Sequence, residues 1–125
     1  MKSLHNYIIN CSDVEKVTIK KKFHKKTGMY GLSLFECNEV YVDSEMNEED
    51  LYITVLHEFF HYFFKDECDN RKHATFDPNK DPIERRAENS AKNMLLWYKY
   101  NQEQYSVFKE FVGKFPKKTL KKNEL

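Results

Sequence analysis

Cysteine is scarce in this chain of 125 residues, which contains only three. Cys11, Cys37 and Cys68 are odd in number and form no CxxC pair, so neither a disulfide framework nor a cysteine zinc site is indicated. The sequence also lacks an apolar stretch long enough for a signal peptide or a membrane-spanning segment. We therefore expect a reducing, cytoplasmic setting and no membrane partner.

An excess of either charge is lacking as well, because the formal net charge is only +1. Global electrostatics therefore does not select nucleic acid as a partner. Lysines are nevertheless clustered in residues 20–26 and again in residues 117–122. These clusters leave a nucleic-acid-associated protein open as an alternative. The absence of a recognisable nucleic-acid-binding motif argues against it, and a nucleic-acid partner is not expected.

Aromatic residues, by contrast, are plentiful, with ten Phe and eight Tyr. Such a content favours a folded globule, and the length fits one domain, which we predict to span residues 1–115. A helix predicted at residues 102–112 is stopped by Gly113 and Pro116. The lysine-rich tail that follows, residues 116–125, is expected to be loose.

Three segments of the N-terminal half read as strands. Residues 14–23 alternate in part between apolar and polar side chains, which indicates a strand with a lysine-rich outer face. Residues 31–35 and 40–42 are short runs of β-forming residues joined across Cys37 and Asn38, a pattern typical of a hairpin. The sequence therefore predicts a small sheet, antiparallel or mixed, ahead of the helices.

Two longer helices are marked by clear start signals. Asn47 is placed to cap a helix that carries a broad apolar arc over residues 51–64, with Asp50 completing a capping box. Asp81, followed by proline, opens a second helix whose apolar pattern runs to about Tyr100. Strands followed by helices give an α+β fold class.

The most informative motif lies on the first of these helices: residues 57–61 read HExxH. His57 and His61 are four residues apart and share one helix face, so both imidazoles can bind one metal, while Glu58 reaches a water on that metal. Zn²⁺ accepts imidazole nitrogens and, with three protein ligands, leaves a position for water. The motif predicts a zinc-dependent hydrolase with Glu58 as general base. The plainer alternative is a partly buried helix whose histidines hydrogen-bond to backbone.

A catalytic zinc site needs a third protein ligand, and two candidates stand out. Glu84 lies on the second long helix with Glu88 one turn later, so one carboxylate can bind the metal while the other accepts a ring N–H of a ligating histidine. Glu84 also stands at the third position after the Asp81 cap, which a capping box alone would explain. The other candidate, His73, lies in a charged segment read as a loop.

The order of these motifs resembles the ImmA/IrrE family of zinc metallo-endopeptidases, and more broadly the small gluzincins of phages and mobile elements. The resemblance rests on HExxH at residues 57–61, ExxA at residues 84–87 and the leucine-containing helix that follows, and covers roughly residues 30–96. It implies a zincin-like fold, with a small sheet packed on the HExxH helix and on a second long helix. It also implies a cytoplasmic endopeptidase, in several members directed at a transcriptional repressor, with His57, His61 and Glu84 on zinc.

Two further interpretations remain open. The segment that begins with His73 and Ala74 is similar to the third-ligand segment of SprT-like proteases, which would make His73 the ligand instead of Glu84. A non-catalytic, zinc-stabilised antirepressor module would sequester a regulatory protein without cutting it. Glu58 favours catalysis over that module, because a structural zinc site has no need of a carboxylate beside the first histidine.

Overall fold

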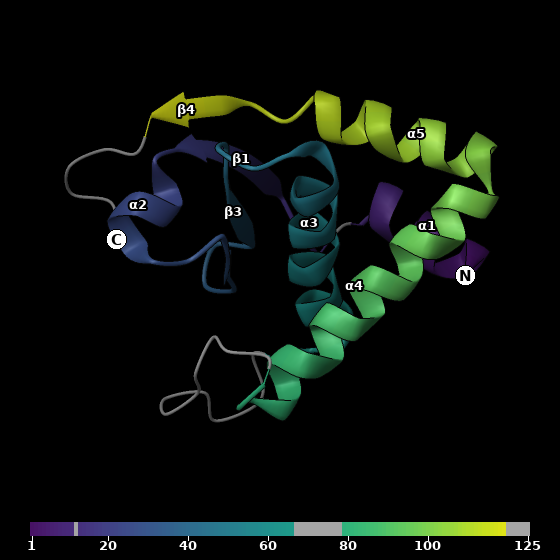
Figure 1. Ribbon diagram of the computed structural model, residues 1–125, viewed down its shortest axis with the longest axis horizontal. Coiled ribbons are helices and arrows are strands. Elements are labelled where there is room, and N and C mark those ends of the chain that lie inside the picture. Colours follow the sequence, from purple (N-terminus) through teal and green to yellow (C-terminus); the bar gives the residue numbers. More distant parts are fainter. Residues whose placement is uncertain (12, 67–78, 120–125) are drawn as a thin grey trace.

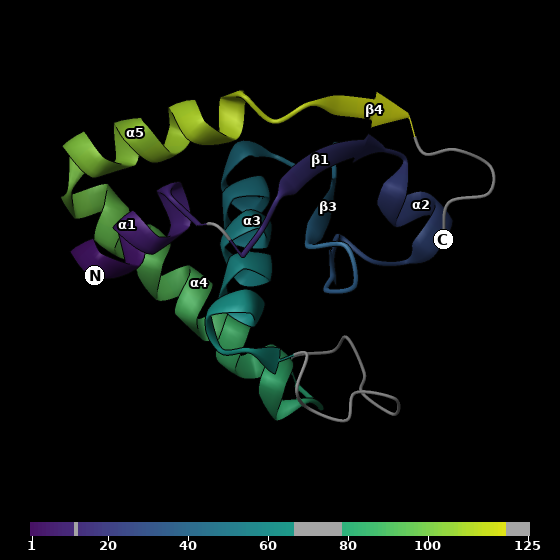
Figure 2. The ribbon, with the colours of Figure 1, turned by 180° about the vertical axis from the view of Figure 1, so that it is seen from behind.

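The computed structural model describes residues 1–11, 13–66 and 79–119 and has an α+β fold. In these residues it contains five helices and one four-stranded mixed sheet. Figures 1 and 2 show α3 at the centre of the molecule, between the sheet and α4. In chain order the elements are α1 (Lys2–Ile9), β1 (Lys16–Lys21), α2 (Phe23–Thr27), β2 (Gly31–Leu34), β3 (Glu39–Asp43), α3 (Glu48–Phe63), α4 (Pro82–Tyr100), α5 (Gln102–Gly113) and β4 (Lys117–Thr119).

The strand order in the sheet is β2-β3-β1-β4. The predicted hairpin is confirmed: β2 and β3 pair antiparallel, and Asn38 in the turn between them has a left-handed backbone with φ of 56°. β1 then pairs with β3 in parallel, which makes the sheet mixed. This register aligns Val17 with Val40, and Ile19 with Val42, as two buried pairs in the hydrophobic core.

The prediction of a loose C-terminal tail is wrong for residues 117–119. Lys117–Thr119 form β4, which pairs in parallel with β1, and the Ile19 amide donates to the Pro116 carbonyl at 2.8 Å. Backbone hydrogen bonding therefore anchors a segment whose lysine-rich composition alone indicated no strand. The pairing also brings the two lysine clusters onto neighbouring strands, with Lys20 opposite Lys118.

Both predicted helix starts are confirmed. The Asn47 side chain accepts a hydrogen bond from the Asp50 amide at 2.8 Å, and the Asp81 side chain accepts one from the Ile83 amide at 2.9 Å. These caps satisfy amide donors that the first helical turn leaves without a partner. They fix where α3 and α4 begin, and the two helices pack against each other.

The far end of α4 is held by a cluster of aromatic rings. Tyr98 stacks on Phe108 of α5 with ring centroids 4.8 Å apart, and both side chains are fully buried. The Tyr98 hydroxyl lies 2.7 Å from Nδ1 of His5 on α1, a short helix that the sequence pattern did not reveal. None of the described helices combines the length and the apolar character needed to cross a bilayer.

Candidate metal centre

The two histidines of the HExxH motif lie on the α3 face that packs against α4. Potential metal-binding atoms of His57, Glu58 and His61 all lie within 4.8 Å of one another. The side chains of Glu58 and His61 are buried, and that of His57 is half-buried. Because the two imidazoles are four residues apart on a helix, their rings lie side by side with centroids 4.8 Å apart. The predicted grouping of His57, Glu58 and His61 is therefore present in space.

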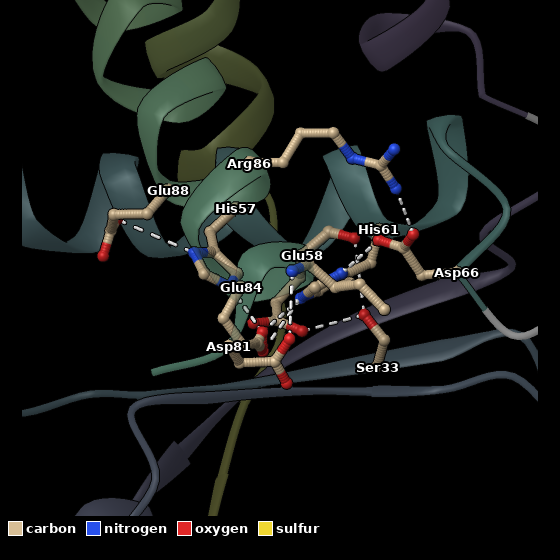
Figure 3. Close-up of polar contacts among 10 residues, drawn as sticks. Ser33, His57, Glu58, His61, Asp66, Asp81, Glu84, Arg86 and Glu88 are labelled. Atoms are coloured by element: carbon tan, nitrogen blue, oxygen red, sulfur yellow. Dashed lines mark hydrogen bonds and ion pairs between the residues drawn. The ribbon is translucent and has the colours of Figure 1, made fainter. Parts of the chain in front are cut away.

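Glu84, from the first turn of α4, enters the space between the two imidazoles (Figure 3). One carboxylate oxygen, Oε2, lies 3.4 Å from Nε2 of His57 and 3.0 Å from Nε2 of His61. Ligands bound tetrahedrally to zinc at 2.0–2.1 Å are about 3.3 Å apart. The distances from Glu84 to the two imidazoles thus match the spacing of ligands around one zinc ion, and two imidazoles with a carboxylate are a donor set that fits the metal.

The histidines and glutamates of this cluster shift one another's pKa values. Burial lowers the pKa of His57, but the carboxylates of Glu84 and Glu88 outweigh it and raise that pKa to about 10. His61 is likewise desolvated, and Glu84 more than compensates, so its pKa is also raised. Burial acts to raise the pKa of Glu84, but the two imidazoles hold it well below its usual range. Without a metal, protonated histidines pair with an ionised Glu84, and metal binding must release protons.

These shifts predict how the stability of the metal-free protein depends on pH. The stabilising effect of His57 is fully present below pH 6.5, its unperturbed pKa, and is lost as the pH rises towards 10. The effect of Glu84 is present above pH 4.5 and is lost on acidification. Urea unfolding in a chelator is therefore expected to show a free energy of unfolding that falls above pH 6.5. His57→Gln should flatten this slope, and an equal slope in both proteins would contradict the ion pair.

Glu88 lies on the outer side of His57, as the sequence predicts. Its Oε1 is 3.6 Å from Nδ1 of His57, an ion-pair distance, and this contact lowers the pKa of Glu88 although burial opposes the shift. Nε2 of the same imidazole faces Glu84. Glu88 is thus placed to orient the His57 ring from behind while Nε2 stays directed at the centre.

Asp66 occupies the corresponding place behind His61, and the sequence analysis missed it. Its Oδ2 lies 2.6 Å from Nδ1 of His61, and its Oδ1 accepts a hydrogen bond from Arg86 at 2.6 Å. The only signal in the sequence was a carboxylate five residues after the second histidine, at the start of the charged segment read as a loop. The other candidate third ligand, His73, falls outside the described residues.

The Glu58 carboxylate is held by a hydrogen bond from the sheet. The Ser33 hydroxyl on β2 donates to Oε1 of Glu58 at 2.8 Å. The carboxylate borders a cavity of about 210 Å³ between β2 and the two helices. The residues that line it are Gly31, Leu32, Ser33, Phe35, Glu58, His61 and Glu84. The cavity thus brings together a strand at the edge of the described sheet, the candidate base and two candidate ligands.

Comparisons of the chain with family models, curated proteins and solved structures return no match. Function is therefore inferred from the centre itself. Within the described residues, its geometry brings together all five of the residues predicted for the site: His57, Glu58, His61, Glu84 and Glu88.

Gly31 leaves room for the Glu58 carboxylate. Adding a side chain at this position therefore tests how far hydrolysis depends on the position of that carboxylate. A Cβ at position 31 would lie 2.8 Å from Cγ2 of Thr54 and 3.0 Å from Oε2 of Glu58. Gly31→Ala is expected to displace the carboxylate and to lower any hydrolytic rate roughly tenfold to a hundredfold, with zinc affinity unchanged. Gly113→Ala is the control, because its Cβ meets nothing within 4 Å. Equal rates for the two variants would show that the Glu58 position tolerates the shift.

Proposed function

We propose that this chain is a zinc-dependent endopeptidase of the zincin type that acts in the cytoplasm. The observation that supports the proposal is that two buried carboxylates, those of Glu84 and Glu58, occupy different positions in the centre. Glu84 lies between the two imidazoles at ligand spacing, while Glu58 is bound by Ser33 and borders the cavity. A site that only stabilised the fold would need no second buried carboxylate facing a cavity. The resemblance to the ImmA/IrrE family points to the same activity.

In this proposal His57, His61 and Glu84 hold the zinc ion. Bound there, zinc supplies Lewis-acid chemistry, polarising the scissile carbonyl and making water a stronger acid. Glu58 accepts the proton of the attacking water and passes it to the leaving amine. Ser33 donates to one oxygen of Glu58 and so fixes the carboxylate, and the other oxygen remains for the proton.

The substrate proposed is an extended peptide segment of a protein. β2 is an edge strand of the described sheet, and Gly31, Leu32 and Ser33 on this strand line the cavity beside Glu58. An extended chain can pair with such an edge through backbone hydrogen bonds, which suits peptides of varied sequence. Leu32 and Phe35 give the cavity apolar walls for a side chain of the substrate. A transcriptional repressor as substrate follows from the family resemblance alone.

The proposal is tested by measuring zinc content and peptide cleavage on the same preparation. We expect one zinc ion per chain after reconstitution, and cleavage of peptides in a mixed-sequence library detected by mass spectrometry. A chelator should stop cleavage, and added zinc should restore it. A wild-type chain that takes up no zinc would overturn the proposal. Zinc uptake without any cleavage would overturn the peptidase and favour the binding module.

A further inference from the structure

The buried carboxylate of Asp66 contacts both His61 of the candidate metal centre and Arg86 of α4. Asp66 has 0% exposure, although it lies beyond the end of α3. Both of its oxygens have partners: Oδ2 lies 2.6 Å from Nδ1 of His61, and Oδ1 lies 2.6 Å from the Arg86 guanidinium (Figure 3). Burying a carboxylate away from water is costly unless it is paired and hydrogen-bonded, and these two contacts supply the partners that Asp66 needs.

The contact with Asp66 determines which nitrogen of His61 faces the centre. An ionised carboxylate accepts hydrogen bonds and donates none, so a contact of 2.6 Å requires a proton on Nδ1. When His61 gives up one proton to bind a metal, Nδ1 keeps its proton and the other nitrogen, Nε2, carries the free lone pair. Nε2 is the atom that lies 3.0 Å from the Glu84 carboxylate. Asp66 therefore selects the tautomer in which His61 offers Nε2 to a metal.

Arg86 connects this arrangement to α4. It lies two residues after Glu84, and its guanidinium is stacked over the ring of Phe64, 4.2 Å from the ring centre. Phe64 is the C-cap residue that follows α3. Arg86 therefore holds the end of α3, through Phe64 and Asp66, against the turn of α4 that carries Glu84. The same contacts fix the relative positions of His61 and Glu84.

We propose that Asp66, held by Arg86, is a positioning residue that presents Nε2 of His61 to zinc and thereby sets the affinity of the site. This inference rests on the proposed function, because it assigns a role at the same zinc site. It adds a residue outside both the HExxH and the ExxA motifs. Partners behind a ligating histidine raise its basicity and fix its orientation, and losing one commonly costs 10- to 100-fold in metal affinity.

The test compares zinc dissociation constants, measured by chelator competition, for the wild type and three variants. Asp66→Asn keeps the shape but removes the charge, and we expect affinity about 10- to 100-fold weaker. Arg86→Gln removes one of the two partners of Asp66 and leaves its contact with His61, so we expect a smaller loss in the same direction. Arg85→Gln is the matched control, because the Arg85 guanidinium donates to the Asn79 carbonyl. Its affinity should equal that of the wild type.

A second measurement separates positioning from general loss of structure. In the zinc-loaded wild type, the His61 Nδ1 proton should give a far-downfield NMR signal that moves upfield in Asp66→Asn. The melting temperature of each metal-free variant shows whether it folds. Wild-type affinity in a folded Asp66→Asn chain, or an unmoved signal, would overturn this inference and leave the peptidase proposal standing. A wild type that binds no zinc would overturn both.

Discussion

Replacing Glu58 by glutamine is expected to lower the rate of peptide hydrolysis about 10²- to 10⁴-fold while zinc binding is retained. In the wild type the Ser33 hydroxyl donates a hydrogen bond of 2.8 Å to the Glu58 carboxylate. The glutamine amide keeps an oxygen that can accept this bond, but it cannot take a proton from water. The variant therefore removes the proposed proton transfer with little change in shape. Initial cleavage rates and zinc content, measured on the same sample, check the expectation.

Glu103→Gln on α5 is the matched control, because it removes an exposed carboxylate far along the chain from the centre. It should retain the wild-type rate and zinc content. Loss of zinc in Glu58→Gln would instead identify Glu58 as a ligand, a role compatible with its position within 4.8 Å of the histidine nitrogens. An unchanged rate in Glu58→Gln would remove Glu58 from the mechanism altogether.

Glu84→Ala is expected to weaken zinc binding about a hundredfold to a thousandfold, because a complete four-ligand site contributes about 10–16 kcal/mol and a single ligand about a quarter of that. The same change leaves His57 and His61 without their shared carboxylate, so the pKa of His57 should fall from about 10 towards its ordinary value. Competition with a chromogenic chelator measures the affinity, and NMR titration of the histidine rings in the metal-free protein measures the pKa.

The zinc affinity of Glu84→Ala is to be compared with that of Glu88→Ala, because the two carboxylates are proposed to have different roles. Glu88 contacts His57 at Nδ1, the nitrogen that faces away from Glu84, so its removal should cost about tenfold in zinc affinity, less than the removal of Glu84. The reverse order of the two effects would make Glu88 the ligand and Glu84 a capping residue. Wild-type affinity in both variants would direct the search for a third ligand to residues such as His73.

Local signals in the sequence were sufficient to place the central helices and the residues of the centre. Asn47 and Asp81 cap their helices through contacts with residues two or three positions ahead, so neighbouring residues alone determine where α3 and α4 begin. The four-residue spacing of the histidines sets their common face in the same way. Because Glu84 lies in the first turn of α4, packing of the two helices is enough to bring it to His57 and His61.

The features that were missed depend on contacts between distant segments. β4 is polar and only three residues long, and its stability comes from pairing with β1 rather than from its own composition. Asp66 resembles any charged loop residue until Arg86, twenty positions further on, is seen to lie against it. Periodicity and propensity describe neighbours along the chain, so neither reveals such a partner.

The pairing of β4 with β1 also determines when the sheet can be completed during synthesis. It joins Ile19 to Lys117, roughly one hundred residues apart, and contacts of such high sequence separation form slowly because a long loop must close first. The segment that carries the proposed ligands, residues 57–84, is synthesised before β4. Until then β1 has an unpaired edge beside the core residues Val17 and Ile19. Completion of the sheet is therefore expected to be a late step of folding, and until β4 pairs the chain presents an open strand edge to which another chain could bind.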